Sequence, residues 1–477
     1  MSTAVTPGPS ASATTDRTLP ADVLVVFGIT GDLAKVMTFR SLYRLEQRGL
    51  LSCPIVGVAV DDWSVGDLRE HALAAIRGTG ETVDDTVFQR FADRLSYVSG
   101  DFGDADTFAR LSDVIRGART PVFYLEVPPF LFGTVIKGLA DAGLTESARV
   151  VVEKPFGHDL ASARELNDQV HQYLDESQVY RIDHFLGKMG IAEILYLRFA
   201  NAGFEPVWTR DHVSSIQITM AESFGVEDRG HFYDPVGAVR DVVVNHLMQV
   251  VAAATMEVPA THDAAAIKDA MYTLFRAIPP IDPANYVRGQ YDGYREIAGV
   301  APDSTTETYA ALQLQIDNWR WWGVPIFIRT GKHLPVTQTE LRLVFNRPPP
   351  VGFHAMRVRQ PEPQQLVIKL DPSTGVRLLV EAQRGLTAEP EQVSLDMEFA
   401  EEGGEGPTPY EVLLSAALRG DATRFTRQDS VEETWRIVQP LLDSPPAVHP
   451  YAKGSWGPPE ADRLLAGEGR WHEPWVA

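Results

Sequence analysis

The chain has 477 residues, of which 44% are hydrophobic and 22% are charged. This length exceeds one ordinary core, so the composition predicts a globular protein with two domains. The formal net charge of −21 disfavours nucleic acid and anionic membranes as partners, so an anion site must be a local cationic pocket. The single cysteine, Cys53, excludes an internal disulfide framework. With neither a secretory signal nor a bilayer-spanning run, the sequence predicts a cytoplasmic protein.

The N-terminal part predicts a tail and then a nucleotide-binding turn. Residues 1–20 are rich in Ser, Thr, Ala and Pro, which is typical of disorder. Residues 23–27 are all apolar and predict a strand that is buried on both faces of a parallel sheet. A glycine turn over residues 28–34 follows, and then a helical pattern to Gly49. Strand, glycine turn and helix together present a helix N-terminus to a pyrophosphate.

Further apolar strands over 55–60, 122–125 and 150–152 alternate with helical stretches. This alternation predicts a doubly wound, Rossmann-like dinucleotide-binding domain over residues 21–180. The strand at 150–152 runs into Glu153-Lys154-Pro155, at the strand end where open α/β sheets hold ligands. A cis Pro155 would aim Lys154 into that crevice, and the alternative is a turn with a surface lysine.

Residues 180–188, with the sequence YRIDHFLGK, carry several charged side chains in an apolar setting. If the segment is helical, His184 and Lys188 share one face and suit a phosphate monoester, while Asp183 points elsewhere. The alternative is a solvated polar face. The apolar neighbours predict at least half burial, which favours a site because buried charges need partners.

The remainder predicts an α+β domain over residues 181–477. Residues 213–222 alternate as a strand does. Residues 237–256 predict a helix, in which Asp241 and His246 would lie roughly 140° apart and could both reach one cavity. Short strands are expected at 307–317, 325–330, 340–346, 365–370, 376–381 and 393–399, which predicts a large, mostly antiparallel sheet. The tryptophans after Tyr451 should pack over a surface.

The motifs then match a known family in order along the chain. They are FGITGDLAK, EKPFG, RIDHFLGK, GAVRDVVVNHLMQ, GQYDGY, FIRTGK and YAKGSWGPPEAD. From about Asp22 onward, the chain resembles glucose-6-phosphate dehydrogenases. The resemblance implies oxidation of glucose 6-phosphate at C1 to a 6-phosphogluconolactone with NADP or NAD, the first step of the pentose phosphate pathway. It also implies a homodimer, or a homotetramer of dimers, formed through the large sheet.

The resemblance assigns roles to individual residues. His246 is similar to the family's general base and Asp183 to its carboxylate partner, which suits an imidazole that titrates near neutrality. The substrate contacts it implies are His184 and Lys188 for the phosphate, Glu222 and Asp241 for sugar hydroxyls, and the cations Lys332 and Lys154. The cofactor contacts it implies are Gly28, Thr30, Gly31, Asp32 and Leu33 at the pyrophosphate, with Val60 at the ribose and Lys154 between cofactor and substrate.

Departures from the family pattern fall in the cofactor and phosphate sites. Val60 replaces the arginine for the NADP 2′-phosphate, and Asp61 follows it, so we expect NAD to serve at least as well as NADP. Met37 and Thr337 stand where the family carries a basic residue, Phe185 replaces its usual tyrosine, and Met189 replaces an acidic residue that often follows Lys188. Each missing charge-assisted bond would cost roughly 1.5–3 kcal/mol. They predict weaker binding of glucose 6-phosphate or a changed substrate.

Three alternatives remain. One is a dehydrogenase of another or an unphosphorylated hexose, and another is a weakly active paralogue that senses a sugar phosphate. The third is the wider class of two-domain sugar oxidoreductases. The sequence contains no CxxC or HxxxH spacing that would predict a metal site, and no residues for a structural NADP site are evident.

Overall fold

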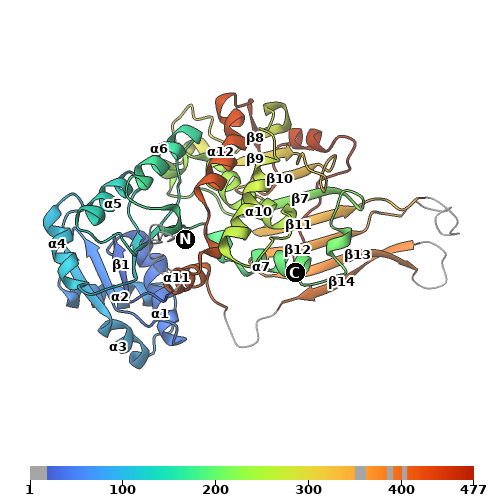
Figure 1. The fold of residues 1–477 in the computed structure, drawn as a ribbon. Helices are drawn as coiled ribbons and strands as arrows, with labels where there is room; N and C mark the ends of the chain where they lie inside the picture. The colour runs from blue at the N-terminus through green and yellow to red at the C-terminus, as the bar shows by residue number, and fades with distance from the viewer. Residues whose placement is uncertain (1–18, 350–360, 384–389, 400–405, 477) are drawn as a thin grey trace, which may run out of the picture. The chain divides into compact units, whose positions relative to one another are not determined.

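The computed structural model describes residues 19–349, 361–383, 390–399 and 406–476, and the chain divides into two compact units (Figure 1). The first unit comprises residues 1–152, 173–180 and 414–422. The second comprises residues 153–172, 181–413 and 423–477. The boundary that we expected after residue 180 therefore differs. Residues 153–172 precede it but belong to the second unit, and residues 414–422 follow it but belong to the first. The expected tail lies outside the described residues except for residues 19 and 20.

The first unit is built on a parallel sheet. Among the described residues it has six strands in the order β3-β2-β1-β4-β5-β6, which is the order of dinucleotide-binding folds. The strands are β1 Val23–Phe27, β2 Ile55–Ala59, β3 Leu95–Ser99, β4 Pro121–Leu125, β5 Arg149–Val152 and β6 Val179–Arg181. The predicted Rossmann-like fold is confirmed. The sequence did not indicate β3, in which only two of five residues are buried, or the three-residue β6.

Helices lie on both faces of this sheet (Figure 1). They are α1 Phe39–Gln47, α2 Val65–Gly78, α3 Asp85–Asp93, α4 Ala105–Val114 and α5 Phe132–Asp141, and the C-terminal part of α11 Pro409–Arg419 joins them. Ser64 and Asp67 form a reciprocal capping box that starts α2. The strand β1 is fully buried, as its unbroken apolar sequence predicted.

The second unit contains a large mixed sheet. Its nine strands in the described residues run in the order β14-β13-β12-β11-β7-β10-β9-β8-β15. The pairs β7–β10 and β8–β15 are parallel and the others are antiparallel, so the predicted mostly antiparallel sheet is confirmed. The strands are β7 Val213–Ala221, β8 Tyr286–Tyr291, β9 Tyr309–Leu314, β10 Ile326–Gly331, β11 Gln338–Phe345, β12 Gln365–Asp371, β13 Gly375–Gln383, β14 Pro390–Glu398 and β15 Val448–Tyr451. Strands β8 and β15 were not predicted.

The helices of this unit are α6 Leu160–His171, α7 Met189–Phe199, α8 Gly230–Tyr233, α9 Met248–Thr255, α10 Ala264–Arg276 and α12 Gln428–Asp443. A π-helix, Val239–Leu247, leads directly into α9. It replaces the first half of the regular helix that we expected over residues 237–256. The C-terminal tryptophans pack on the sheet as predicted: Trp456 and Trp471 lie against a buried cluster that includes Tyr291 and Tyr309.

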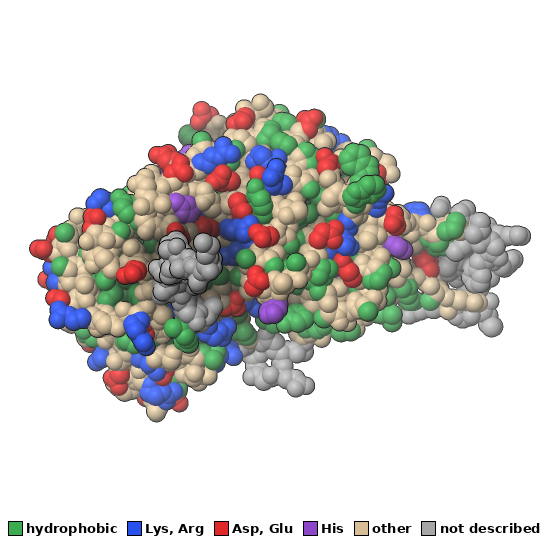
Figure 2. Space-filling model, viewed as in Figure 1, with side chains coloured by type: hydrophobic (Ala, Val, Ile, Leu, Met, Phe, Trp, Pro, Cys, Tyr) green, Lys and Arg blue, Asp and Glu red, His purple; other side chains and the backbone are tan. Residues whose placement is uncertain are grey.

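The face drawn in Figure 2 mixes acidic and basic side chains over both units, so the negative charge forms no single patch there. Within the described ranges, no helix has the length and apolar character needed to cross a bilayer.

Candidate active site

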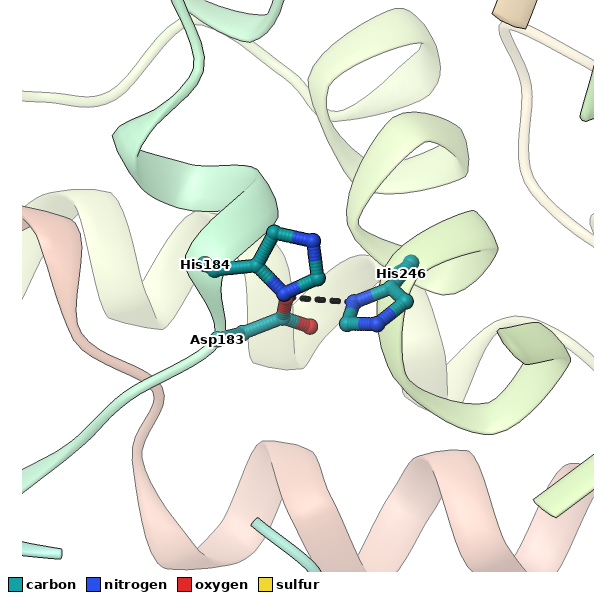
Figure 3. A group of neighbouring side chains, drawn as sticks. All are labelled: Asp183, His184 and His246. Carbon is teal, nitrogen blue, oxygen red and sulfur yellow. Dashed lines mark hydrogen bonds and ion pairs between the residues drawn. The ribbon is translucent and has the colours of Figure 1, made fainter. Parts of the chain in front are cut away.

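A carboxylate and two imidazoles meet inside the second unit (Figure 3). Asp183 and His184 follow β6, and His246 comes from the π-helix. The Asp183 Oδ1 and His246 Nδ1 atoms are 2.6 Å apart, and the two residues are 3% and 2% exposed. The ring of His184 meets that of His246 edge-on, with centroids 4.4 Å apart. Asp183 and His246 are 63 positions apart in the chain, so only the fold joins them.

The segment around Asp183 is two short pieces rather than one helix. Asp183 begins a 3-10 helix, His184–Gly187, and its Oδ1 accepts a hydrogen bond from the Phe185 amide at 3.0 Å. Lys188 is extended and precedes α7. The helix that we expected to place His184 and Lys188 on one face is therefore wrong. The expected burial is confirmed, since Phe185 is 0% exposed.

The π-helix sets the relation between Asp241 and His246. A π-helix closes its hydrogen bonds between residues five apart, so residues at that spacing lie about one turn above each other. The separation of about 140° that we expected for an α-helix is wrong for this reason. Both side chains reach Lys154, whose Nζ lies 3.1 Å from Asp241 Oδ1 and 3.0 Å from His246 Nε2. The Lys154-Pro155 bond is cis, as proposed from the sequence.

These contacts define the protonation of His246. An ionised Asp183 can only accept, so Nδ1 carries the proton and Nε2 presents its lone pair. Burial lowers the pKa of His246, Asp183 opposes this effect, and the Lys154 ammonium lowers the pKa further, for a net decrease. Burial raises the pKa of Asp183, but the attraction to His246 and the hydrogen bond between them outweigh it and bring that pKa to about 2. His246 is thus a neutral base beside an ionised carboxylate.

The residues assigned to the phosphate carry less free charge than expected. Burial, helped by His246 and the nearby lysines, lowers the pKa of His184 to about 3, so this side chain is neutral at neutral pH. The Lys188 ammonium pairs with Asp371 Oδ1 at 2.9 Å. The sequence reasoning missed Asp371. The available signal was an acidic residue before proline at the end of a predicted strand, much as Lys154 precedes Pro155.

The Glu222 and Lys332 side chains form an ion pair of 2.8 Å. Each directly follows a strand, and β7 and β10 are parallel neighbours with Ala221 opposite Gly331. The carboxyl ends of these strands therefore place both side chains at one edge of the sheet. Nearby, Thr337 bonds to the amide and hydroxyl of Ser223, so its hydroxyl is already engaged.

The glycine turn lies in the first unit. Gly28 has φ +82°, and a Cβ there would lie 2.3 Å from the carbonyl oxygen of Glu126, so only glycine fits. A Cβ on Gly31 would meet only the Gly28 carbonyl oxygen, which leaves its other sides open. At the end of β2, Asp61 Oδ2 accepts a bond from the Thr30 hydroxyl at 2.7 Å, and Val60 is 62% exposed. Asp32 and Leu33 continue the turn toward a π-helix, Ala34–Thr38.

In the part of the chain that the structure describes, Asp183, His184 and His246 are also spaced as metal ligands would be, within 4.8 Å. However, Asp183 and His246 use facing atoms to bond each other, and the Lys154 ammonium faces His246 Nε2. A donor set already joined in this way suits proton transfer better than a cation. That no metal is used stays a prediction.

These features are typical of a nicotinamide-dependent dehydrogenase: a parallel sheet with a glycine turn, a buried His–Asp pair and a neighbouring lysine. Two family models match the chain: "Glucose-6-phosphate dehydrogenase, NAD binding domain" over residues 25–192, and "Glucose-6-phosphate dehydrogenase, C-terminal domain" over residues 195–473. The chain therefore belongs to the glucose-6-phosphate dehydrogenase family, whose members are oxidoreductases.

Individual relatives support the same family membership. The chain is 54% identical to glucose-6-phosphate 1-dehydrogenase 1 of Mycobacterium tuberculosis, covering 96% of this chain and 97% of that one. It is 38% identical to glucose-6-phosphate 1-dehydrogenase of Bacillus subtilis, covering 94% and 98%. A crystal structure of the Mycobacterium avium enzyme superposes with a TM-score of 0.90 at 53% identity, covering 96% and 100%. A glucose-6-phosphate dehydrogenase in complex with glucose 6-phosphate gives 0.89 at 33% identity, covering 95% and 99%.

Proposed function

We propose that this chain oxidises glucose 6-phosphate at C1 to 6-phosphogluconolactone, with His246 as the general base. The observation that carries the proposal is the buried Asp183–His246 bond, with Nε2 left as the acceptor. In the reaction, the C1–H bond breaks with its electron pair while the proton of the C1 hydroxyl moves to His246 Nε2. Asp183 then stabilises the imidazolium that forms.

Lys154 holds the place that the sugar hydroxyl must take. Its ammonium donates to Nε2 and is also held by Asp241. We infer that substrate binding moves this ammonium from Nε2 to the C1 oxygen. There, the cation would favour loss of the hydroxyl proton. A positive charge beside the imidazole also keeps His246 unprotonated before the reaction.

The sugar and its phosphate would bind to the charged and polar side chains that surround His246. Glu222 and Asp241 are acceptors for hydroxyls, and Lys332 holds Glu222 in place. Lys188 supplies the cation for the phosphate once it leaves Asp371. His184 is neutral before binding but can still donate a ring N–H, and a phosphate dianion would favour its protonated form.

The first unit fits a dinucleotide. The open surroundings of Gly31 and the left-handed Gly28 allow close approach of a pyrophosphate, with the turn over Thr30, Asp32 and Leu33 around it. The nicotinamide supplies the acceptor for the hydride from C1. The chain supplies binding, orientation and the base.

The environment of Asp61 supports the use of NAD at least as well as NADP. Its carboxylate is held beside the glycine turn by Thr30, and the Tyr97 hydroxyl donates to its backbone oxygen at 2.7 Å. A fixed carboxylate repels a 2′-phosphate and accepts bonds from a free ribose diol. Val60 stands where the arginine that would oppose this repulsion is expected, which leaves the repulsion unbalanced.

A second candidate is oxidation of an unphosphorylated hexose. It is favoured by the Lys188–Asp371 pair and by the neutral His184. Initial rates of the purified full chain with glucose and glucose 6-phosphate, each with NAD and NADP, separate the two. We expect glucose 6-phosphate to give the higher kcat/KM. A higher value with glucose would transfer the assignment to the second candidate, and a kcat/KM strongly favouring NADP would refute the cofactor proposal.

The His246→Asn variant tests the base. Loss of a general base typically costs roughly 10²–10⁴-fold in rate, so kcat should fall by about that factor. Unchanged turnover in H246N would refute the role.

We also propose, from family membership, a homodimer or a tetramer of dimers that works in the cytoplasm. Light scattering on the purified protein determines the first of these.

A further inference from the structure

Phe185 contacts two groups with different proposed roles. Its ring stacks on the imidazole of His246 with centroids 4.5 Å apart and planes inclined by 15°. The Lys188 ammonium lies 4.4 Å from the centre of the same ring. The side chain is 0% exposed, and its backbone amide donates to Asp183 Oδ1, the oxygen that also bonds His246. One residue therefore touches the base, its carboxylate partner and the phosphate-site lysine.

The ring contacts two groups that are cationic or become so in the reaction. Both groups approach its centre closely, and no hydrogen bond or ion pair joins Lys188 to His246 among the described residues. The imidazole packs parallel to the ring and the ammonium lies at cation–π distance from the same ring, so the phenyl group contacts both at once. The negative face of a phenyl ring attracts a cation and also packs against a parallel ring.

We propose that Phe185 is a positioning residue that couples substrate-phosphate binding at Lys188 to the orientation of His246. This inference rests on the proposed roles of those two residues. The bond to Asp183 fixes the imidazole at Nδ1, whereas the Lys154 contact at Nε2 is the one that the substrate hydroxyl would replace. The plane of the ring then needs a further constraint. Stacking on Phe185 supplies it, so Nε2 stays directed at the position of the C1 hydroxyl.

The same contact acts on charge during the reaction. His246 becomes an imidazolium as it takes the proton, and an aromatic face stabilises a cation. Phosphate binding would draw Lys188 away from Asp371 and so change the cation that contacts the same ring. In this way, binding energy from the remote phosphate can contribute to kcat as well as to KM.

Three variants of the full chain test the proposal. Phe185→Leu removes the aromatic ring, and Phe185→Tyr keeps it. Phe275→Leu removes an equally buried ring from α10, a helix that carries none of these residues, as a control for lost packing. Stacking and cation–π contacts of this kind are each worth up to about tenfold in an equilibrium or rate. We expect F185L to lower kcat and raise KM for glucose 6-phosphate, each by about 3- to 10-fold.

The pH profile and a double variant separate positioning from structure. Losing stabilisation of the imidazolium should move the acid limb of kcat/KM to lower pH in F185L, but not in F185Y or F275L. The losses in kcat of F185L and Lys188→Met should be less than additive in the combined variant. The proposal is overturned if F185L behaves like F275L, if F185Y loses as much as F185L, or if the two losses in kcat add. Failure of the proposed function is a separate result, namely no loss of turnover in H246N.

Discussion

Replacing Asp183 by asparagine probes the proton-transfer pair with little change in shape. Asp183 Oδ1 accepts two bonds, from His246 Nδ1 and from the Phe185 amide, whereas Oδ2 is buried without a partner. The amide oxygen introduced by the D183N substitution should therefore take the Oδ1 position. The reverse orientation would set the new NH2 group against the N–H of Phe185. The reactive tautomer of His246 is retained, and the variant removes the negative charge.

The size of the effect follows from that charge. A carboxylate and an imidazolium interact by about 4 kcal/mol at about 4 Å with an effective dielectric constant of about 20. Because this interaction exists fully only when His246 is protonated, its loss raises the barrier to proton transfer. We expect kcat to fall by roughly 10²–10³-fold, with KM for glucose 6-phosphate little changed. The NH2 group left without a partner should cost about 1–3 kcal/mol of stability.

The measurement is steady-state NAD(P)H absorbance across pH, with Tm as the control for folding. Asp183 raises the pKa of His246, so its removal should shift the acid limb of kcat/KM to lower pH. A D183N enzyme that folds and keeps kcat close to that of wild type would refute the charge argument. A fall in kcat with a limb moved to higher pH would refute the assignment of that limb to His246.

Three further predictions concern the groups around this pair. Asp61→Asn should raise the NADP-to-NAD ratio of kcat/KM by about tenfold, because it removes repulsion of a 2′-phosphate; an unchanged ratio contradicts this. His184 is kept neutral, with a folded-state pKa of about 3 against 6.5 ordinarily, so its contribution to stability is full above pH 6.5 and is lost as pH falls toward 3. This lowers the free energy of unfolding by at most about 1.4 kcal/mol per pH unit. In His184→Gln, urea unfolding below the ordinary histidine pKa should show a less steep fall of that free energy with falling pH. An equally steep fall would contradict the prediction. Asp371→Asn frees Lys188 and should lower KM for glucose 6-phosphate about threefold at constant kcat, since a partly exposed ion pair is worth up to about 1 kcal/mol; a raised KM would show that Asp371 assists binding.

The local pattern of the sequence determined much of the first unit. An unbroken apolar strand followed by a glycine turn has few other structures available, because burial on both faces and a left-handed glycine are local requirements. The same reasoning placed most strands of the large sheet, where alternation and turn residues mark each strand. It missed β3, whose pattern is mixed, and β8, which lies in a stretch noted only as a motif.

The site itself depended on the tertiary structure. The sequence, through its motifs, named Asp183, His246 and Lys154, but segments far apart in the chain must fold together before their atoms meet. The choice of a π-helix over an α-helix is not encoded in an apolar period, yet it brings Asp241 and His246 to one lysine. Burial likewise decided that His184 is neutral and that Lys188 is shared between Asp371 and the ring of Phe185. Charge states follow from the surrounding dielectric and the partners of each group, and both are set only when the chain has folded.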